Sequence, residues 1–241
     1  MLVLRSLVFN VLFIGGTAIA LIVIGIPLLA APATWIFAVG RVWARCVCWL
    51  MRVVLGLRWA LRGDAALLRP GVLVAAKHQS TWDTIIFYML VRRSAYVMKK
   101  ELMAIPVYGW LARRQKHIAV DRKAGGAALR RMQRDAQAAL DLGATIVVFP
   151  QGTRVAPGAT QPYHPGIAGL YGALNVPVVP VALNSGLFWG RRSFIKKPGT
   201  IVLEVLPELP AGMKRAQLMR EIESRIETAT ARLEAEATRT P

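Results

Sequence analysis

The chain has 241 residues, enough for one sizeable domain with an appendage, and 55% of them are hydrophobic while only 18% are charged. Lysine and arginine outnumber aspartate and glutamate by 31 to 13, which gives a net charge of +18. This composition excludes an ordinary soluble domain and disfavours a nucleic-acid binder, so it indicates a partner that is both apolar and anionic, such as a lipid membrane surface.

The N-terminus begins with a long apolar segment. No charged residue lies between Arg5 and Arg41, and this run exceeds the roughly 20 residues that a helix needs to cross a bilayer core. The run is too long for the core of a signal peptide, so we expect it to be retained. Pro27 and Pro32 interrupt it, which leaves two arrangements open. The membrane-embedded helical segment is either a single span or a re-entrant hairpin within one leaflet.

A basic helix is predicted directly after this run. Arg41, Arg45 and Arg52 recur at spacings that place them on one helix face. Basic side chains and tryptophans favour the headgroup layer, so the helix is predicted to lie at the membrane interface. The alternative is an amphipathic helix packed on a globular domain. The arginine excess predicts that the downstream domain lies on the cytoplasmic side of a bacterial-type inner or plasma membrane.

The sequence pattern changes near Gly63, where short segments typical of β-strands begin to alternate with helical segments. Such alternation indicates an α/β domain with a mixed, partly parallel sheet flanked by helices. We therefore expect membrane-anchoring and interfacial helices in residues 1–62 and a globular domain in residues 63–241. The predicted strands are 72–76, 145–149, 178–183 and 201–206, and the predicted helices are 127–142 and 216–237, the last with a buried stripe of Leu218, Ile222, Ile226 and Leu233.

A histidine and an aspartate follow the first of these strands. His78 is predicted on the turn that enters a helix capped by Ser80 or Thr81, and Asp83 in the first helical turns. A carboxylate there can fold back and hold one imidazole nitrogen as a donor, which leaves the other nitrogen free to accept a proton. This is the base and its orienting group without a serine nucleophile, so a substrate hydroxyl would attack. Taken alone, a histidine and an aspartate at this spacing more often have a structural role.

Four segments in order carry a resemblance to a known family. The chain resembles the glycerolipid acyltransferases, the group that contains the 1-acyl-sn-glycerol-3-phosphate acyltransferases, over roughly residues 63–190. The segments are HQSTWD (78–83) as a His-x4-Asp motif, KKEL (99–102) with Pro106 and Gly109-Trp110, FPQGTR (149–154) and VPVVPV (176–181).

The resemblance implies an enzyme that transfers a fatty acyl group from acyl-CoA or acyl carrier protein to the sn-2 hydroxyl of lysophosphatidic acid, giving phosphatidic acid. It implies no metal, no cofactor and no nucleic acid. His78 and Asp83 would be the catalytic pair. The set implied to bind the substrate phosphate is Lys99, Arg154, Gly152 and Thr153; physically, the cations suit phosphate oxygens and the glycine permits close backbone approach.

One position departs from the family pattern. Gln151 stands where the third segment usually has glutamate, and glutamine cannot ionise. We expect Gln151 and Pro180 to support the site rather than react, and the missing charge beside Arg154 to favour an anionic headgroup. Two alternatives stay open: another acceptor, such as a lyso-ornithine lipid, or an inactive basic protein that binds membrane surfaces.

Two further histidines lie outside these motifs. His117 and His164 stand alone in the sequence and lack the spacing of metal ligands. We therefore expect structural roles for both.

Overall fold

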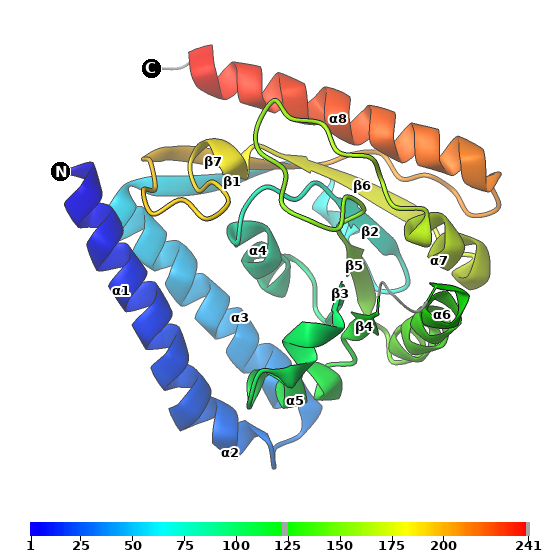
Figure 1. The fold of residues 1–241 in the computed structure, drawn as a ribbon, viewed down its shortest axis with the longest axis horizontal. Helices are drawn as coiled ribbons and strands as arrows, with labels where there is room; N and C mark the ends of the chain where they lie inside the picture. Colours follow the sequence, from blue (N-terminus) through cyan, green and yellow to red (C-terminus); the bar gives the residue numbers. More distant parts are fainter. Residues whose placement is uncertain (122–124, 240–241) are drawn as a thin grey trace.

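The protein is built around a seven-stranded sheet that lies between helices (Figure 1). The computed structural model describes residues 1–121 and 125–239. The strand order is β1-β7-β6-β2-β5-β3-β4, and all neighbouring strands are parallel except β6 and β7. The predicted mixed, partly parallel sheet is thereby confirmed. The strands are β1 (Leu57–Gly63), β2 (Leu73–Ala76), β3 (Ser94–Lys99), β4 (Ile118–Val120), β5 (Thr145–Val148), β6 (Val178–Leu183) and β7 (Gly199–Val205).

The central strands β2, β5 and β6 are buried along their whole length. Helices cover both faces of a parallel sheet, so its inner strands read as continuous apolar runs rather than as alternating patterns. Alternate residues of β2 point to opposite faces of the sheet and pack in different clusters. Val74 and Ala76 pack in one cluster with α3 (Ala33–Leu50) and α4 (Trp82–Leu90). Leu73 and Ala75 pack in a second cluster with α6 (Gly125–Asp141), α7 (Gly166–Leu174) and α8 (Arg215–Arg239).

The helices of the α/β part follow the strands in chain order. The C-terminal helix was predicted over residues 216–237, and its predicted stripe is buried at all four positions. This helix runs along β6 on the side of the sheet opposite to the N-terminal helices (Figure 1). The helices are α4 (Trp82–Leu90), α5 (Tyr108–Arg114), α6 (Gly125–Asp141), α7 (Gly166–Leu174) and α8 (Arg215–Arg239).

Strand β1 is a correction to the predicted organisation. It spans Leu57–Gly63 and pairs with β7 along its whole length, so the boundary predicted between residues 62 and 63 falls inside a strand of the sheet. Arg58 and Arg62 are exposed on this strand, as suits the edge of a sheet. The sheet therefore begins at Leu57; the division into an anchoring and a globular part stays a prediction.

The N-terminal segment folds into a helical hairpin. Helix α1 (Leu2–Ala20) continues through Leu21–Gly25 and α2 (Ile26–Leu28), and α3 (Ala33–Leu50) continues through Met51–Leu55. The chain reverses at residues 29–32, as the hairpin alternative requires, and Arg5 Nε donates to the Val54 carbonyl at 2.6 Å.

Pro27 does not interrupt the first arm of this hairpin, contrary to expectation. A π-helical turn, Leu21–Gly25, precedes it and accommodates the missing N–H within one continuous helix. This helix, Leu2–Leu28, has the length and hydropathy to cross a membrane, and only 6% of its most apolar window is buried within the protein.

Helix α3 packs on the globular part, as the alternative interpretation of this basic helix expects. Ala44, Val47 and Cys48 are buried in the cluster that contains α4. Trp35 and Trp49 remain exposed on the same helix. One face of α3 thus packs in the protein core, and the other face carries exposed aromatic side chains. The position of α3 at a membrane interface stays a prediction.

Candidate active site

The predicted site residues gather at one edge of the sheet. Strands β6, β2, β5 and β3 are adjacent and parallel, so their carboxyl ends lie side by side. His78 follows β2, Arg154 follows β5, and Lys99 ends β3. This edge is where open α/β sheets place their ligand sites.

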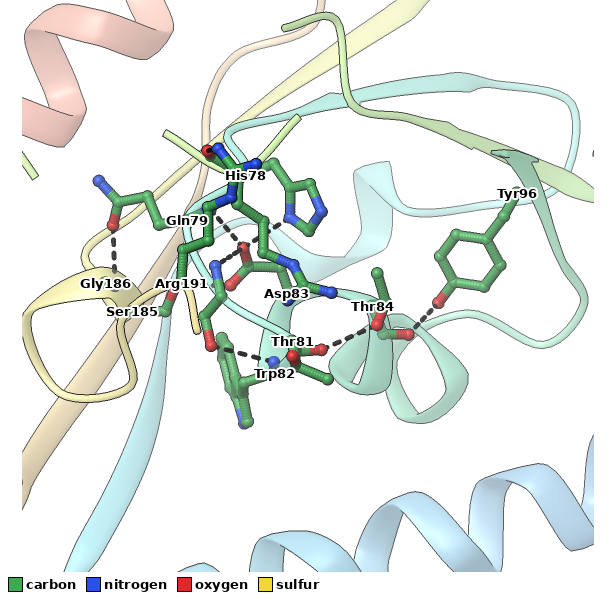
Figure 2. A network of polar contacts seen from close by, with 12 residues as sticks. His78, Gln79, Thr81, Trp82, Asp83, Thr84, Tyr96, Ser185, Gly186 and Arg191 are labelled. Atoms are coloured by element: carbon green, nitrogen blue, oxygen red, sulfur yellow. Dashed lines mark hydrogen bonds and ion pairs between the residues drawn. The ribbon is translucent and has the colours of Figure 1, made fainter. Parts of the chain in front are cut away.

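The His78 and Asp83 side chains are in direct contact. Nδ1 of His78 lies 2.9 Å from Oδ2 of Asp83, across the turn that joins β2 to α4 (Figure 2). Asp83 is 0% exposed and His78 is 9% exposed. An ionised carboxylate can only accept, so Nδ1 carries the proton, and Nε2 is the basic nitrogen of the neutral ring.

The Asp83 carboxylate accepts three more hydrogen bonds. The N–H groups of Gln79 and Ser80 donate to Oδ2 at 2.7 and 2.8 Å, and the Ser185 hydroxyl donates to Oδ1 at 2.5 Å (Figure 2). Charge-assisted bonds of this kind are strong and fix both oxygens. Ser185 was missed from the sequence; its only signal is that it follows a buried parallel strand.

The surroundings of His78 leave Nε2 available. The imidazole stacks on the Phe149 ring with centroids 4.1 Å apart and planes 22° from parallel. The N–H of Val155 donates to the His78 carbonyl at 2.8 Å, which ties the His78 turn to the loop after β5. Within residues 1–121 and 125–239, Nε2 of His78 has no hydrogen-bond partner. The arrangement can therefore take a proton from a hydroxyl placed at Nε2.

The loop after β5 presents Arg154. Gly152 adopts a left-handed φ of +64°, and its N–H donates to the Phe149 carbonyl at 2.8 Å, which turns the chain sharply. Burial lowers the pKa of Arg154, Asp83 opposes this shift, and Arg191 adds to it. Arg191 also donates to the Arg154 carbonyl at 3.3 Å, a second arginine at this site that the sequence analysis missed. Thr153 is partly exposed between Gly152 and Arg154.

Gln151 and Pro180 do not reach the reacting edge. Gln151 is 1% exposed, and its Nε2 donates to Glu227 of α8 at 3.4 Å. A carboxylate therefore stands beside Gln151. That the missing charge beside Arg154 favours an anionic headgroup stays a prediction. Pro180 lies inside β6, in register with Ala75 of β2, and its carbonyl accepts from the Leu206 N–H at 3.0 Å.

An apolar cavity of about 740 Å³ borders this site. Residues of α1 and α3 line it on one side, and residues of α4, β3 and α5 line it on the other. Arg154 also belongs to its lining, so the cavity opens beside a cation. Apolar walls with a single charged group suit a ligand with a hydrocarbon chain and an anionic head.

His117 packs against two tyrosines, Tyr88 and Tyr96. Its Nε2 lies 3.1 Å from the Tyr88 hydroxyl, and its Nδ1 accepts from the Tyr96 N–H at 3.3 Å. Burial lowers the pKa of His117 from 6.5 to about 3. These contacts fit the predicted structural role.

The His117 shift predicts a pH effect on stability. As the pH falls below about 6.5, His117 takes up a proton in the unfolded chain, whereas in the folded chain it does so only near pH 3. Protonation therefore favours the unfolded state, and the stability contributed by His117 is lost as the pH falls from about 6.5 to about 3. Between pH 8 and 5 the wild type should lose about 2 kcal/mol more unfolding free energy than His117→Gln, whose amide can keep both hydrogen bonds. Denaturant unfolding in detergent measures this; an identical pH dependence of the two proteins would contradict it.

Comparisons with known proteins agree with this geometry. The profile of the family called Acyltransferase matches residues 58–184. The chain is 32% identical over 201 residues to the 1-acyl-sn-glycerol-3-phosphate acyltransferase of Pseudomonas aeruginosa, covering 83% of this chain and 78% of that one. It is 30% identical over 167 residues to the human 1-acyl-sn-glycerol-3-phosphate acyltransferase alpha, covering 66% and 58%.

A solved structure shares the fold. The 1-acyl-sn-glycerophosphate acyltransferase of Thermotoga maritima superposes with a TM-score of 0.78 at 21% identity, and the match covers 98% of each chain. The family profile and the sequence matches lead to one conclusion. The chain belongs to the acyltransferase family that includes the 1-acyl-sn-glycerol-3-phosphate acyltransferases.

Proposed function

We propose that this protein transfers a fatty acyl group from a thioester to the free sn-2 hydroxyl of lysophosphatidic acid, which gives phosphatidic acid. The observation that carries the proposal is the buried His78–Asp83 pair, which lies beside Arg154 and an apolar cavity. The names of the relatives support the same acceptor. Lysophosphatidic acid has one hydroxyl to deprotonate, one phosphate and one acyl chain, and each has a matching feature at this site.

In the proposed reaction the acceptor oxygen attacks the thioester carbonyl carbon while its proton passes to Nε2 of His78. The new ester C–O bond forms, the C–S bond breaks, and the thiolate takes the proton from His78 as it leaves. Asp83 stays ionised and stabilises the imidazolium in between. A positioned base of this kind contributes about 10²–10⁴-fold in rate.

The proposed lipid position uses the cations and the cavity together. The phosphate lies at Arg154 and Lys99, with Gly152 and Thr153 offering backbone and hydroxyl donors, and the acyl chain enters the cavity under the helical hairpin. The hairpin would hold the protein in the membrane from which the lipid arrives. Its exposed apolar helix and the charge of +18 support binding to an anionic bilayer. The cytoplasmic orientation rests on Arg41, Arg45 and Arg52.

The donor is proposed as acyl-CoA or acyl carrier protein. Both are thioesters that carry negative charge, so both suit a strongly basic protein. A lyso-ornithine lipid remains the second acceptor to compare, because it shares the hydroxyl and chain but lacks the phosphate.

The test is acyl transfer in detergent micelles with oleoyl-CoA as donor and either lysophosphatidic acid or the lyso-ornithine lipid as acceptor. Phosphatidic acid as the main product would support the proposal. Turnover with the lyso-ornithine lipid alone would keep the chemistry and overturn the acceptor. If neither acceptor reacts, with acyl carrier protein also tried as donor, the basic membrane-surface binding protein becomes the better description.

Arg154→Ala should lower kcat/KM for lysophosphatidic acid by about 10–100-fold, chiefly through KM, because a charge-assisted hydrogen bond to the phosphate is lost. Any turnover with a phosphate-free acceptor should change far less. Arg134→Ala on α6 is the matched control, since it removes an exposed cation from the opposite layer of the fold. An equal loss with both acceptors would place Arg154 outside the phosphate site.

A further inference from the structure

The C-terminal helix α8 supplies a partly buried carboxylate, Glu227, beneath the site. Glu227 accepts from Lys77 Nζ at 2.6 Å, from the Tyr163 hydroxyl at 2.8 Å and from Gln151 Nε2 at 3.4 Å. Lys77 directly precedes His78 in the chain, and Gln151 directly precedes the Gly152 turn that presents Arg154. One side chain of α8 therefore touches both segments that carry the proposed catalytic and phosphate-binding groups.

Lys77 depends on this contact. Its side chain is only 2% exposed, and an ammonium group in such a place is strongly destabilising without a counter-ion. Glu227 provides that counter-ion from a helix that lies 150 positions further along the chain. Burial raises the pKa of Tyr163, and the nearby Glu227 carboxylate raises it further. The phenol therefore stays protonated and donates a hydrogen bond to Glu227.

A second carboxylate repeats the pattern two helical turns further along α8. Glu234 accepts from Gln79 Nε2 at 2.6 Å and from the Gly158 N–H at 3.0 Å. Gln79 lies on the His78 turn, and Gly158 lies on the loop that follows Arg154. Because residues seven apart share a helix face, α8 bridges the same two segments twice from one side.

We propose that Glu227 and Glu234 are positioning residues that set the place of His78 relative to Arg154, which deepens and rests on the proposed function. The same geometry explains Gln151. Its amide donates to Glu227, whereas a glutamate there would place a buried carboxylate against the partly buried carboxylate of Glu227, beside Lys77. The negative charge of this network thus comes from α8 instead of the loop after β5.

The test is a charge exchange between Gln151 and Glu227. Gln151→Glu and Glu227→Gln should each lower kcat by roughly 10–100-fold, because small displacements of a catalytic group have effects of this size. The double variant Gln151→Glu/Glu227→Gln should return to within about three-fold of the wild type, since it restores one carboxylate and one amide. Glu221→Gln, which breaks a surface pair with Arg225 on the same helix, is the control and should keep wild-type kcat.

A second readout separates this inference from the proposed reaction. The rate at which diethyl pyrocarbonate modifies His78, followed by mass spectrometry, reports the imidazole's environment without any lipid substrate. Both single variants should change this rate, and the double variant should restore it. Glu234→Gln, which keeps an acceptor oxygen for Gln79, should change it less than Glu227→Gln.

The outcomes are distinct. If the wild type acylates neither acceptor but the labelling follows the expected pattern, the proposed function fails and the positioning role stands. If the single variants fold and keep both kcat and His78 labelling within two-fold of the wild type, the positioning role is overturned. Loss of activity in both single variants and in the double variant would also overturn it, because the proposal requires that one carboxylate and one amide work in either arrangement.

Discussion

Replacing His78 by alanine is expected to lower kcat for acyl transfer by about 10²–10⁴-fold while the KM for each substrate changes little. The variant keeps Arg154, Lys99 and the apolar cavity, so both substrates still bind, but nothing takes the hydroxyl proton as the C–O bond forms. Initial rates with oleoyl-CoA and lysophosphatidic acid at saturation measure the effect directly.

The fold should tolerate this substitution. Asp83 keeps its hydrogen bonds from Gln79, Ser80 and Ser185, so no buried carboxylate is left without donors. His164→Ala, which removes an exposed imidazole, is the matched control and should stay within about two-fold of wild type, as is usual for surface substitutions. A His78→Ala protein that melts like the wild type and still turns over at more than half its rate would remove His78 from the mechanism.

The central strands and the last helix could be predicted because their patterns are local. Strands β2, β5 and β6 are short apolar runs between turn residues, and α8 repeats apolar residues at helical spacing. Strand β1 could not be predicted in the same way. Its arginines and tryptophan resemble the preceding interfacial pattern, and only the pairing with β7, far along the chain, makes it a strand.

The candidate site divides along the same line. His78 and Asp83 are five positions apart on one turn, so their contact follows from the sequence alone. Ser185 reaches Asp83 across 102 positions, and Glu227 reaches Lys77 across 150. Ser185 and Glu227 reach the site because the fold places β6 and α8 next to the segments around β2. No local sequence motif predicts these contacts.

Gln151 illustrates the difference most clearly. In the sequence, Gln151 indicates the loss of a charge beside Arg154, because the contact between Gln151 and Glu227 cannot be predicted from the sequence. In the fold its amide lies against Glu227, so a carboxylate from another element stands beside Gln151. A departure from a family motif is therefore interpretable only together with the side chains that surround it.

Asp83→Asn is expected to lower kcat on the order of 10³-fold with a nearly unchanged fold. Three donors converge on Oδ2 of Asp83, so the asparagine oxygen should take that place and keep Nδ1 of His78 as a donor. Its NH₂ group then faces the Ser185 hydroxyl, which can rotate to accept. The tautomer survives, and what is lost is the negative charge that stabilises the imidazolium.

Asp83→Ala provides the contrast for this prediction. It leaves the two backbone N–H groups and the Ser185 hydroxyl buried without an acceptor, so the unfolding free energy should fall by about 3–5 kcal/mol. Thermal melting in detergent, with kcat measured on the folded fraction, separates the two substitutions. If Asp83→Asn is as unstable as Asp83→Ala, the carboxylate is chiefly a structural cap of the His78 turn. If Asp83→Asn melts like the wild type and is nearly inactive, the charge itself serves the chemistry, because every hydrogen bond around it has been kept.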